Sequence, residues 1–329
     1  MASSILPGKT RKNCVRSISL PARFHSSTLR IEEELNKLKA WETTTTASHG
    51  NVEMIHSGLS GLKDLYDCVE DVLQLPLTQQ QAHNYSDEKL VDEVLDGSVG
   101  LLDVCDTTRN ILMQMKENGR DLQYGLRRRG TGAESTMESK VDAYICCRKK
   151  LRKEMLKCIG LLKRMESKFI GSSYPLLLDQ NNHLVVVVVR VLREVSSITI
   201  SVFRSLLSFL SAPSSSKPKT SSRWSLVSKL LHQKGQITSF NGKHHQDDDI
   251  NIDNEVESVD VAIHNLSSCR KNRTSTLEVA QKRLNALEVS IEGLEDGLES
   301  MFKCLIKTRV SLLNNFSVCQ SRDLIIRIR

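Results

Sequence analysis

The first side chains that could carry chemistry are two histidines followed closely by three aspartates. His244, His245 and Asp247–Asp249 offer imidazole and carboxylate groups, which are common ligands of transition metals. They lie in a polar stretch, and no apolar pattern beside them predicts a rigid frame that would hold the ligands in one geometry. We therefore interpret the run as a solvated tract and predict neither a metal nor a cofactor.

Nine cysteines form the second group, and their spacing argues against joint chemistry. Their number is odd and no two of them form a CxxC pair, which is typical of a reducing compartment. Cys146 and Cys147 are adjacent, so on a helix their side chains point about 100° apart and cannot bind one metal without distortion. We expect buried or idle thiols.

Sequence patterns of the common catalytic sites are absent, including the phosphate-binding loop, the HExxH zinc motif, the GxSxG nucleophile turn and the GxGxxG dinucleotide fingerprint. We therefore expect no enzymatic activity and assign no catalytic residue. Aromatic residues make up only 4% of the chain, which disfavours a nucleic-acid binder that stacks bases on aromatic rings. We expect no nucleic-acid partner.

One linear motif near the N-terminus has a physical mechanism. Arg16, Ser17, Ser19 and Pro21 fit the pattern R-S-x-S-x-P, in which the upstream arginine helps a kinase to select Ser19. Phosphorylation adds about −1.5 to −2 charges, which an arginine cluster on a phosphopeptide adaptor of the 14-3-3 type can bind. A chance match in a stretch rich in serine and arginine is the alternative.

The positive charge of the chain is concentrated at its N-terminus. The chain has 329 residues and a net charge of +7, and Met1–Ile31 carries six basic residues without one acid, leaving +1 for the rest. Three uses of this arm remain open: the adaptor site, a transit peptide and attraction to an anionic membrane surface. They predict respectively a cytoplasmic protein, a plastid protein and a protein at the membrane periphery.

The elements that position these groups are predicted to be helices, because apolar residues recur at steps of three and four. Only 16 glycines and 6 prolines argue against an all-β chain. Glycines and arginines predict a linker over 125–132. The predicted helices cover 52–73, 86–117 with an exit at 118–119, the stretch after the linker with its apolar positions at 141–169, then 183–210 and 277–305.

Two of these predictions need a choice between alternatives. The stretch 183–210 is apolar enough to suggest a membrane span, but four charged residues within it favour a buried helix. Its five consecutive valines would also suit a strand. The seam of 277–305 predicts packing against another helix, within the bundle rather than between chains; the oligomeric state stays open.

Charge and polarity change along the second half of the chain. Residues 213–249 predict a flexible insertion with one short helix near Trp224. Residues 195–246 hold seven bases and no acid, and 247–260 hold seven acids, so the two blocks could pair. The acids Glu292, Glu295 and Glu299, with Asp296, lie opposite the apolar seam of the last helix and are expected to face water.

Ordered motifs along the chain resemble the plant BYPASS-related family of proteins of unknown molecular function. They are RSISLPARFH at 16–25, LKAWE at 38–42, GLKDLY at 61–66, LPLTQQ at 75–80, VDEVLDGSVGLLDVC at 91–105, YICCRKKLRK at 144–153, VLRE at 191–194, LLSFL at 206–210 and FKCLIKTRVSLLNN at 302–315. Ser26 departs from a proline that is frequent in the family. The resemblance implies a helical plant protein without assigned catalytic residues, in a family linked to root and shoot development through control of a root-derived mobile signal.

The predicted fold is an all-α, elongated bundle of five or six long helices with coiled-coil-like heptad seams. A disordered basic arm, 1–31, precedes a single helical domain, 32–329, which the flexible insertion at 213–249 interrupts. We predict a non-enzymatic regulator or interaction protein. A carrier or enzyme for a small signalling metabolite is the alternative if a cavity collects polar groups such as Tyr66, Tyr144 and Arg148. A membrane-peripheral scaffold is the third possibility.

Overall fold

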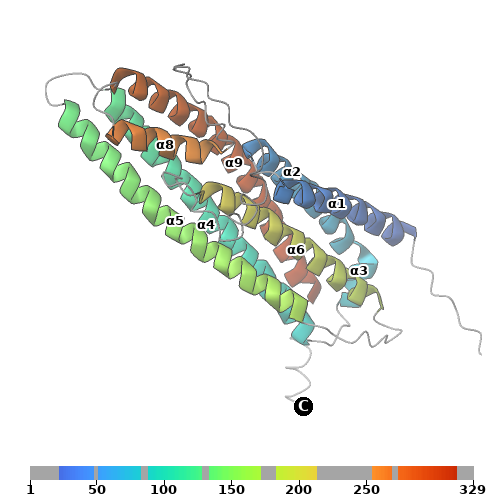
Figure 1. The fold of residues 1–329 in the computed structure, drawn as a ribbon. Helices are drawn as coiled ribbons and strands as arrows, with labels where there is room; N and C mark the ends of the chain where they lie inside the picture. Colours follow the sequence, from blue (N-terminus) through green and yellow to red (C-terminus); the bar gives the residue numbers. More distant parts are fainter. Residues whose placement is uncertain are drawn as a thin grey trace, which may run out of the picture.

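The structure is a computed structural model that describes residues 22–47, 51–82, 88–127, 133–171, 183–212, 254–268 and 273–316. All regular structure within these ranges is helical (Figure 1). The elements are α1 (Ala22–Ala47), α2 (Val52–Leu73), α3 (Pro76–Ala82), α4 (Glu88–Arg127), α5 (Ala133–Gly171), α6 (His183–Leu210), α8 (Glu255–Ser268) and α9 (Arg273–Phe316).

The long helices lie side by side in an elongated bundle, which confirms the predicted architecture (Figure 1). The long C-terminal helix α9 packs along α2, α4 and α8, and α6 packs on α1, α2, α4 and α5. Helix α5 runs along the outer edge of the bundle, and the short α8 lies near the end where α5 begins. This position makes α5 and α8 neighbours, although they come from distant parts of the sequence.

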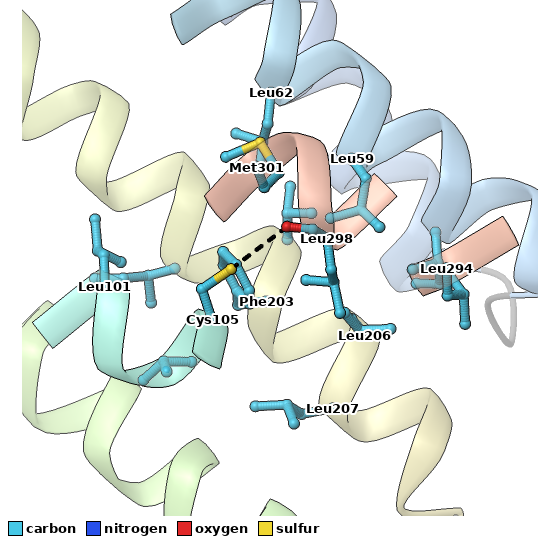
Figure 2. Packing of buried hydrophobic residues seen from close by; sticks show 14 of the residues in the cluster. Leu59, Leu62, Leu101, Cys105, Phe203, Leu206, Leu207, Leu294, Leu298 and Met301 are labelled. Atoms are coloured by element: carbon cyan, nitrogen blue, oxygen red, sulfur yellow. Dashed lines mark hydrogen bonds between the residues drawn. The ribbon is translucent and has the colours of Figure 1, made fainter. Parts of the chain in front are cut away.

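The apolar seams predicted from spacing form one hydrophobic core. Around Phe203 of α6, which is fully buried, lie leucines from α2, α4, α6 and α9 (Figure 2). The thiol of Cys105 in α4 donates to the carbonyl of Leu298 in α9 at 3.7 Å. Every predicted seam residue of 277–305 is buried except Leu277, which is partly buried against the core.

Side-chain caps set two helix starts. Asn51 caps α2 by accepting from the amide of Met54 at 2.9 Å, and Pro76 begins α3 after the single turn that ends α2. Asn254 accepts from the amides of Val256 and Glu257 and donates to the carbonyl of Phe209 at 3.0 Å. This last bond places the start of α8 against the end of α6.

Helix α1 begins at Ala22. The prediction of a disordered arm over residues 1–31 is therefore wrong for residues 22–31. Ile31 is buried, and Arg30 donates to Asp71 of α2 at 2.8 Å. Trp41 donates to the carbonyl of Met54 at 2.7 Å, and a Cβ at Gly58 would lie 2.6 Å from the Trp41 ring. The absence of that Cβ allows α1 and α2 to approach closely.

Helix α4 does not end at 118–119 as predicted but continues to Arg127. Leu122 and Leu126 are 1% and 3% exposed, so burial of these side chains extends the helix through Gly119. The linker predicted at 125–132 is thereby wrong for residues 125–127, and α5 starts at Ala133, directly after the predicted linker. Glycine costs only about 1 kcal/mol inside a helix, which two buried leucines outweigh.

The apolar stretch 183–210 is the helix α6, as predicted, and its valines are helical. Among the described helices none combines the length and apolarity that a membrane crossing requires. The insertion predicted at 213–249, with its short helix near Trp224, lies outside the described residues.

Candidate functional site

A cavity of about 290 Å³ opens between α5 and α8, beside the end of α6. Ionisable side chains from distant helices meet in it. From α5 it is lined by Tyr144, Ile145, Arg148, Lys149 and Arg152, from α8 by Asp260, Ile263 and His264, and after α6 by Ala212. Below we call it the Arg148 cavity.

The centre of the cavity wall is an ion pair between Arg148 and Asp260. Arg148 Nε donates to Asp260 Oδ2 at 3.0 Å and to Oδ1 at 3.3 Å, and both side chains are only 9% exposed. The Tyr144 hydroxyl donates to the same Oδ1 at 3.3 Å. The carboxylate therefore holds both the guanidinium and the phenol in place.

The local sequence explains why a charge is buried here. Arg148 occupies a seam position of α5, one turn after Tyr144 and before the buried Leu151, so it faces the bundle. Asp260 follows the buried Val259 on α8 and accepts a hydrogen bond from Arg148. The sequence suggests Arg148 and Tyr144 as inward polar groups but does not indicate their partner, because Asp260 belongs to a helix far along the chain.

Part of the guanidinium hydrogen-bonding capacity is not used. Arg148 Nη1 and Nη2 and Arg152 Nε are buried and have no hydrogen-bond partner among the described residues. Arg152 lies one helical turn after Arg148, on the same side of α5. Three basic side chains, Arg148, Lys149 and Arg152, thus line a cavity that holds a single carboxylate, Asp260.

Burial shifts the pKa values of Asp260 and Tyr144, the two groups that contact one another beside Arg148. It raises the pKa of the Asp260 carboxyl, and the positive charge of Arg148 opposes that shift. Burial also raises the pKa of the Tyr144 hydroxyl, with a further contribution from the nearby Asp260 charge. Tyr144 is therefore a protonated donor at neutral pH. Asp260 accepts hydrogen bonds from both Tyr144 and Arg148.

Tyr66, the third polar residue named for a possible inner cavity, lies elsewhere. Its hydroxyl is 3.2 Å from that of Thr199 in α6, inside the packed core. Other buried polar groups also join helices: Ser311 of α9 donates to Glu70 of α2 at 2.6 Å, and Asn315 donates to the carbonyl of Leu73 at 2.9 Å. These contacts hold α2 against α6 and α9.

The buried thiols within the described ranges are not activated. Cys68, Cys105 and Cys158 are buried, as expected, and burial raises the pKa of all three, to about 12 for Cys105. The thiolate is the reactive form, so this environment makes them poor nucleophiles. No group of three metal-ligating side chains occurs among the residues that the structure covers.

The other predicted groups lie outside the described residues. These are the phosphorylation motif with Arg16, Ser17, Ser19 and Pro21, and the run from His244 to Asp249. Helix α1 begins at Ala22, directly after the motif. The basic block 195–246 and the acidic block 247–260 were suggested to pair with each other. Arg204 of the basic block instead pairs with Glu166, and Asp260 of the acidic block pairs with Arg148.

The acids of α9 were expected to face water, and this prediction is wrong for those that form ion pairs with α4. Glu295 accepts from Lys116 of α4 at 2.7 Å, Glu292 lies 3.2 Å from the same ammonium, and Glu299 pairs with Arg109. Lys116 and Arg109 of α4 are thus neutralised across the α4–α9 contact. Only Asp296, of the four acids named, is exposed without an ion pair in the structure described.

A second basic surface was missed by summing charges along the chain. The outer face of α5 carries exposed basic side chains within about 140° of arc, counting 100° per residue. We call this the α5 basic face; it consists of Lys149, Lys150, Lys153, Lys157, Lys163, Arg164 and Lys168. Helical spacing of YICCRKKLRK and the residues after it could have revealed this face, although the net charge of the folded part could not.

Fold and site together define, over the described residues, a helical bundle with a packed core and a polar cavity at its edge. The sequence profile of the family described as "Protein BPS1" matches residues 58–314. The chain therefore belongs to the BPS1 family, which confirms the resemblance inferred from its motifs. No curated protein and no solved structure matches the chain in the two other comparisons.

Proposed function

We propose that this protein is a non-enzymatic regulator of plant root and shoot development that acts by binding a small ligand in the Arg148 cavity. The observation that carries the proposal is the buried guanidinium of Arg148, a residue that lines the cavity and whose two Nη atoms lack hydrogen-bond partners among the described residues. The developmental role is what the BYPASS-related resemblance implies, and membership of the BPS1 family supports it.

The chemistry of the cavity supports binding rather than catalysis. A general base needs a proton acceptor that is available to the substrate. Asp260 is instead engaged by both Arg148 and Tyr144, and Tyr144 is held as a donor by its raised pKa. Arginine, lysine and tyrosine side chains of this kind hold and orient a ligand. We therefore favour a binding protein over the enzyme alternative.

The proposal is tested by filling the cavity in a living plant. His264 lines the cavity and is exposed, so His264→Trp should block the space with little effect on folding. In a plant line lacking this protein, the natural chain should restore root and shoot growth, and the blocked variant should not. The matched control is Asn265→Trp, at the next exposed position of α8. Full rescue by His264→Trp would contradict the proposal.

We further propose that Ser19 is a conditional docking site for a 14-3-3-type adaptor. Its motif ends at Pro21, and α1 begins with the next residue. A bound adaptor would therefore lie beside the start of α1, which packs near the end of α2. Pull-down with a phosphorylated peptide spanning Lys12–His25 should capture the adaptor, and the unphosphorylated peptide should not. Equal capture of the adaptor by the two peptides would contradict a docking site that depends on phosphorylation of Ser19.

A membrane-peripheral scaffold is the second candidate function, and the α5 basic face favours it. Each basic side chain near an anionic surface contributes about 1 kcal/mol. A chain lacking residues 1–21 retains every residue of the described helices, so comparing it with the full chain separates the arm from α5. Binding to anionic vesicles should survive the deletion and weaken when Lys157 and Lys163 are changed to Glu. Loss of binding on deletion alone would assign the membrane contact to the arm.

A further inference from the structure

The Arg148 cavity has an unbalanced charge. Arg148, Lys149 and Arg152 contribute three positive charges, and Asp260 contributes one negative charge, so the four groups sum to +2. The side chains of Arg148 and Asp260 are each only 9% exposed. Arg148 is buried and Arg152, one helical turn away, is half-buried, so their like charges repel each other through a medium less polar than water, and a bound anion would offset this repulsion.

We propose that the Arg148 cavity binds the phosphate group of a phosphate ester. The inference rests on the proposed binding function and names the chemical class of its ligand. It uses the two Arg148 Nη atoms and the Arg152 Nε, all of them buried and without a hydrogen-bond partner within the described ranges.

The geometry suits an oxyanion. Asp260 fixes the Nε of Arg148 at 3.0 Å and thereby fixes the plane of the guanidinium, which leaves its two Nη atoms as a rigid pair of donors. Such a fork binds two oxygen atoms of one phosphate or carboxylate at once. The Nε of Arg152 supplies a further donor from the next turn of α5.

Charge selects phosphate over a single carboxylate. A phosphate monoester carries about −1.5 to −2 charges at neutral pH, which matches the +2 of the four groups, whereas a carboxylate carries −1. The volume of about 290 Å³ exceeds the requirement of one phosphate group, so the esterified part has room beside it. His264 and Ile263 on the opposite wall would contact that part.

Two sources could supply the same phosphate chemistry. Lys149 belongs both to the cavity and to the α5 basic face, so a phosphorylated lipid headgroup could enter from a membrane lying against that face. A soluble phosphate ester could enter from water. The experiment therefore includes both sources.

Binding is measured with the full chain by calorimetry, using glycerol 3-phosphate as the soluble ester and succinate as a dicarboxylate of matched charge. Sedimentation with phosphatidylcholine vesicles, with and without phosphatidylinositol phosphate, tests the lipid source. We expect Arg152→Gln to weaken phosphate binding about ten-fold or more, since a hydrogen bond to a charged group is lost. Arg148→Lys keeps the charge and the pair with Asp260 but loses the fork, so it should also weaken binding.

The control variant is Lys140→Gln, which removes one charge from the same helix at a position outside the cavity, where Lys140 pairs with Asp121. It should bind as the natural chain does. Thermal unfolding identifies any variant that fails to fold, and Arg152→Gln leaves the Arg148–Asp260 pair intact.

The outcomes separate the alternatives. Binding of glycerol 3-phosphate, or of phosphoinositide vesicles alone, with loss in the Arg152 and Arg148 variants, supports the proposal and identifies the source. Equal binding of succinate, equal weakening by Lys140→Gln, or no binding of either phosphate probe overturns it. In the last case, failure of His264→Trp to rescue growth would still support a binding function, so the two proposals fail independently.

Discussion

Arg148 of α5 donates from its Nε to both carboxylate oxygens of Asp260 in α8, across 112 residues of sequence. Helix α8 packs mainly on α9, and this pair together with Tyr144 forms its polar attachment to α5. A buried ion pair of this kind contributes little net stability when compared with an apolar pair, but breaking it leaves a buried charge unmatched.

The first prediction concerns that asymmetry. Asp260→Asn should lower the free energy of unfolding by about 3–5 kcal/mol, because Arg148 would lose its counter-charge while remaining buried. The double replacement Arg148→Met with Asp260→Leu should recover most of that loss. Urea unfolding followed by circular dichroism measures both. A loss in the double variant as large as that in the single variant would show that the charges themselves stabilise the fold.

Helical spacing was sufficient to predict most of the architecture. The seams of α2, α6 and α9 follow from local apolar periodicity, because a helix that buries one face must repeat apolar residues at three and four. The five valines of α6 were ambiguous alone, and burial of their neighbours within a longer helical pattern decides for helix. These features are local, so a single sequence contains them.

The Arg148 cavity could be predicted only in part. Arg148 and Tyr144 could be recognised as polar residues on a seam, but Asp260 could not be paired with them, since nothing local indicates which helix faces α5. The bond from Asn254 to the carbonyl of Phe209, which sets α8 beside α6, is equally non-local. The end of α4 was misjudged because Asn118 and Gly119 are common helix-ending residues, and tertiary burial of Leu122 overrides them.

The second prediction tests the extension of α4. Leu122 is 1% exposed, so Leu122→Ala should destabilise the protein by about 2–5 kcal/mol through lost burial and a cavity. Met113 of the same helix is 55% exposed, and Met113→Ala should change stability by less than about 0.5 kcal/mol. Chemical unfolding compares the two. A small effect of Leu122→Ala would indicate that the helix ends near Gly119.

The third prediction compares two helical glycines. A Cβ at Gly58 would lie 2.6 Å from the rigid indole of Trp41, so Gly58→Ala should destabilise by about 1–3 kcal/mol through forced separation of α1 and α2. A Cβ at Gly119 would meet nothing within 4 Å, so Gly119→Ala should stabilise by about 1 kcal/mol through helix propensity. Thermal unfolding gives both signs, and two shifts in the same direction would contradict the packing described.

The fourth prediction concerns pH. Burial raises the pKa of Glu255 at the start of α8 above its ordinary 4.5, although backbone hydrogen bonds from Val52 and Glu255 itself oppose the shift. The folded state thus favours the neutral acid, and the stability from protonation is lost as the pH rises through the folded pKa. Glu255→Gln should therefore be more stable than the natural chain at pH 7.

That advantage should vanish when the pH falls below the ordinary pKa of the carboxyl, because both side chains are then neutral. Melting temperatures at about pH 7 and about pH 4 provide the comparison. Glu154→Gln, at an exposed position of α5, is the control and should change stability by less than about 0.5 kcal/mol at pH 7. An advantage of Glu255→Gln that grows on acidification would reverse the assigned direction of the pKa shift.

The fifth prediction uses thiol chemistry as a map of burial. Cys146 is exposed on α5, whereas Cys105 is buried in the core and its pKa is raised to about 12. A thiol reagent at neutral pH should modify Cys146 in the folded protein and reach Cys105 only on unfolding, because both access and the thiolate form are then restored. Mass spectrometry of the peptides separates the two sites, and Cys146→Ser should abolish labelling of its own peptide without exposing the other. Labelling of Cys105 should follow the same urea midpoint as the loss of helix; labelling well below that midpoint would mean that α4 and α9 separate before the rest of the bundle unfolds.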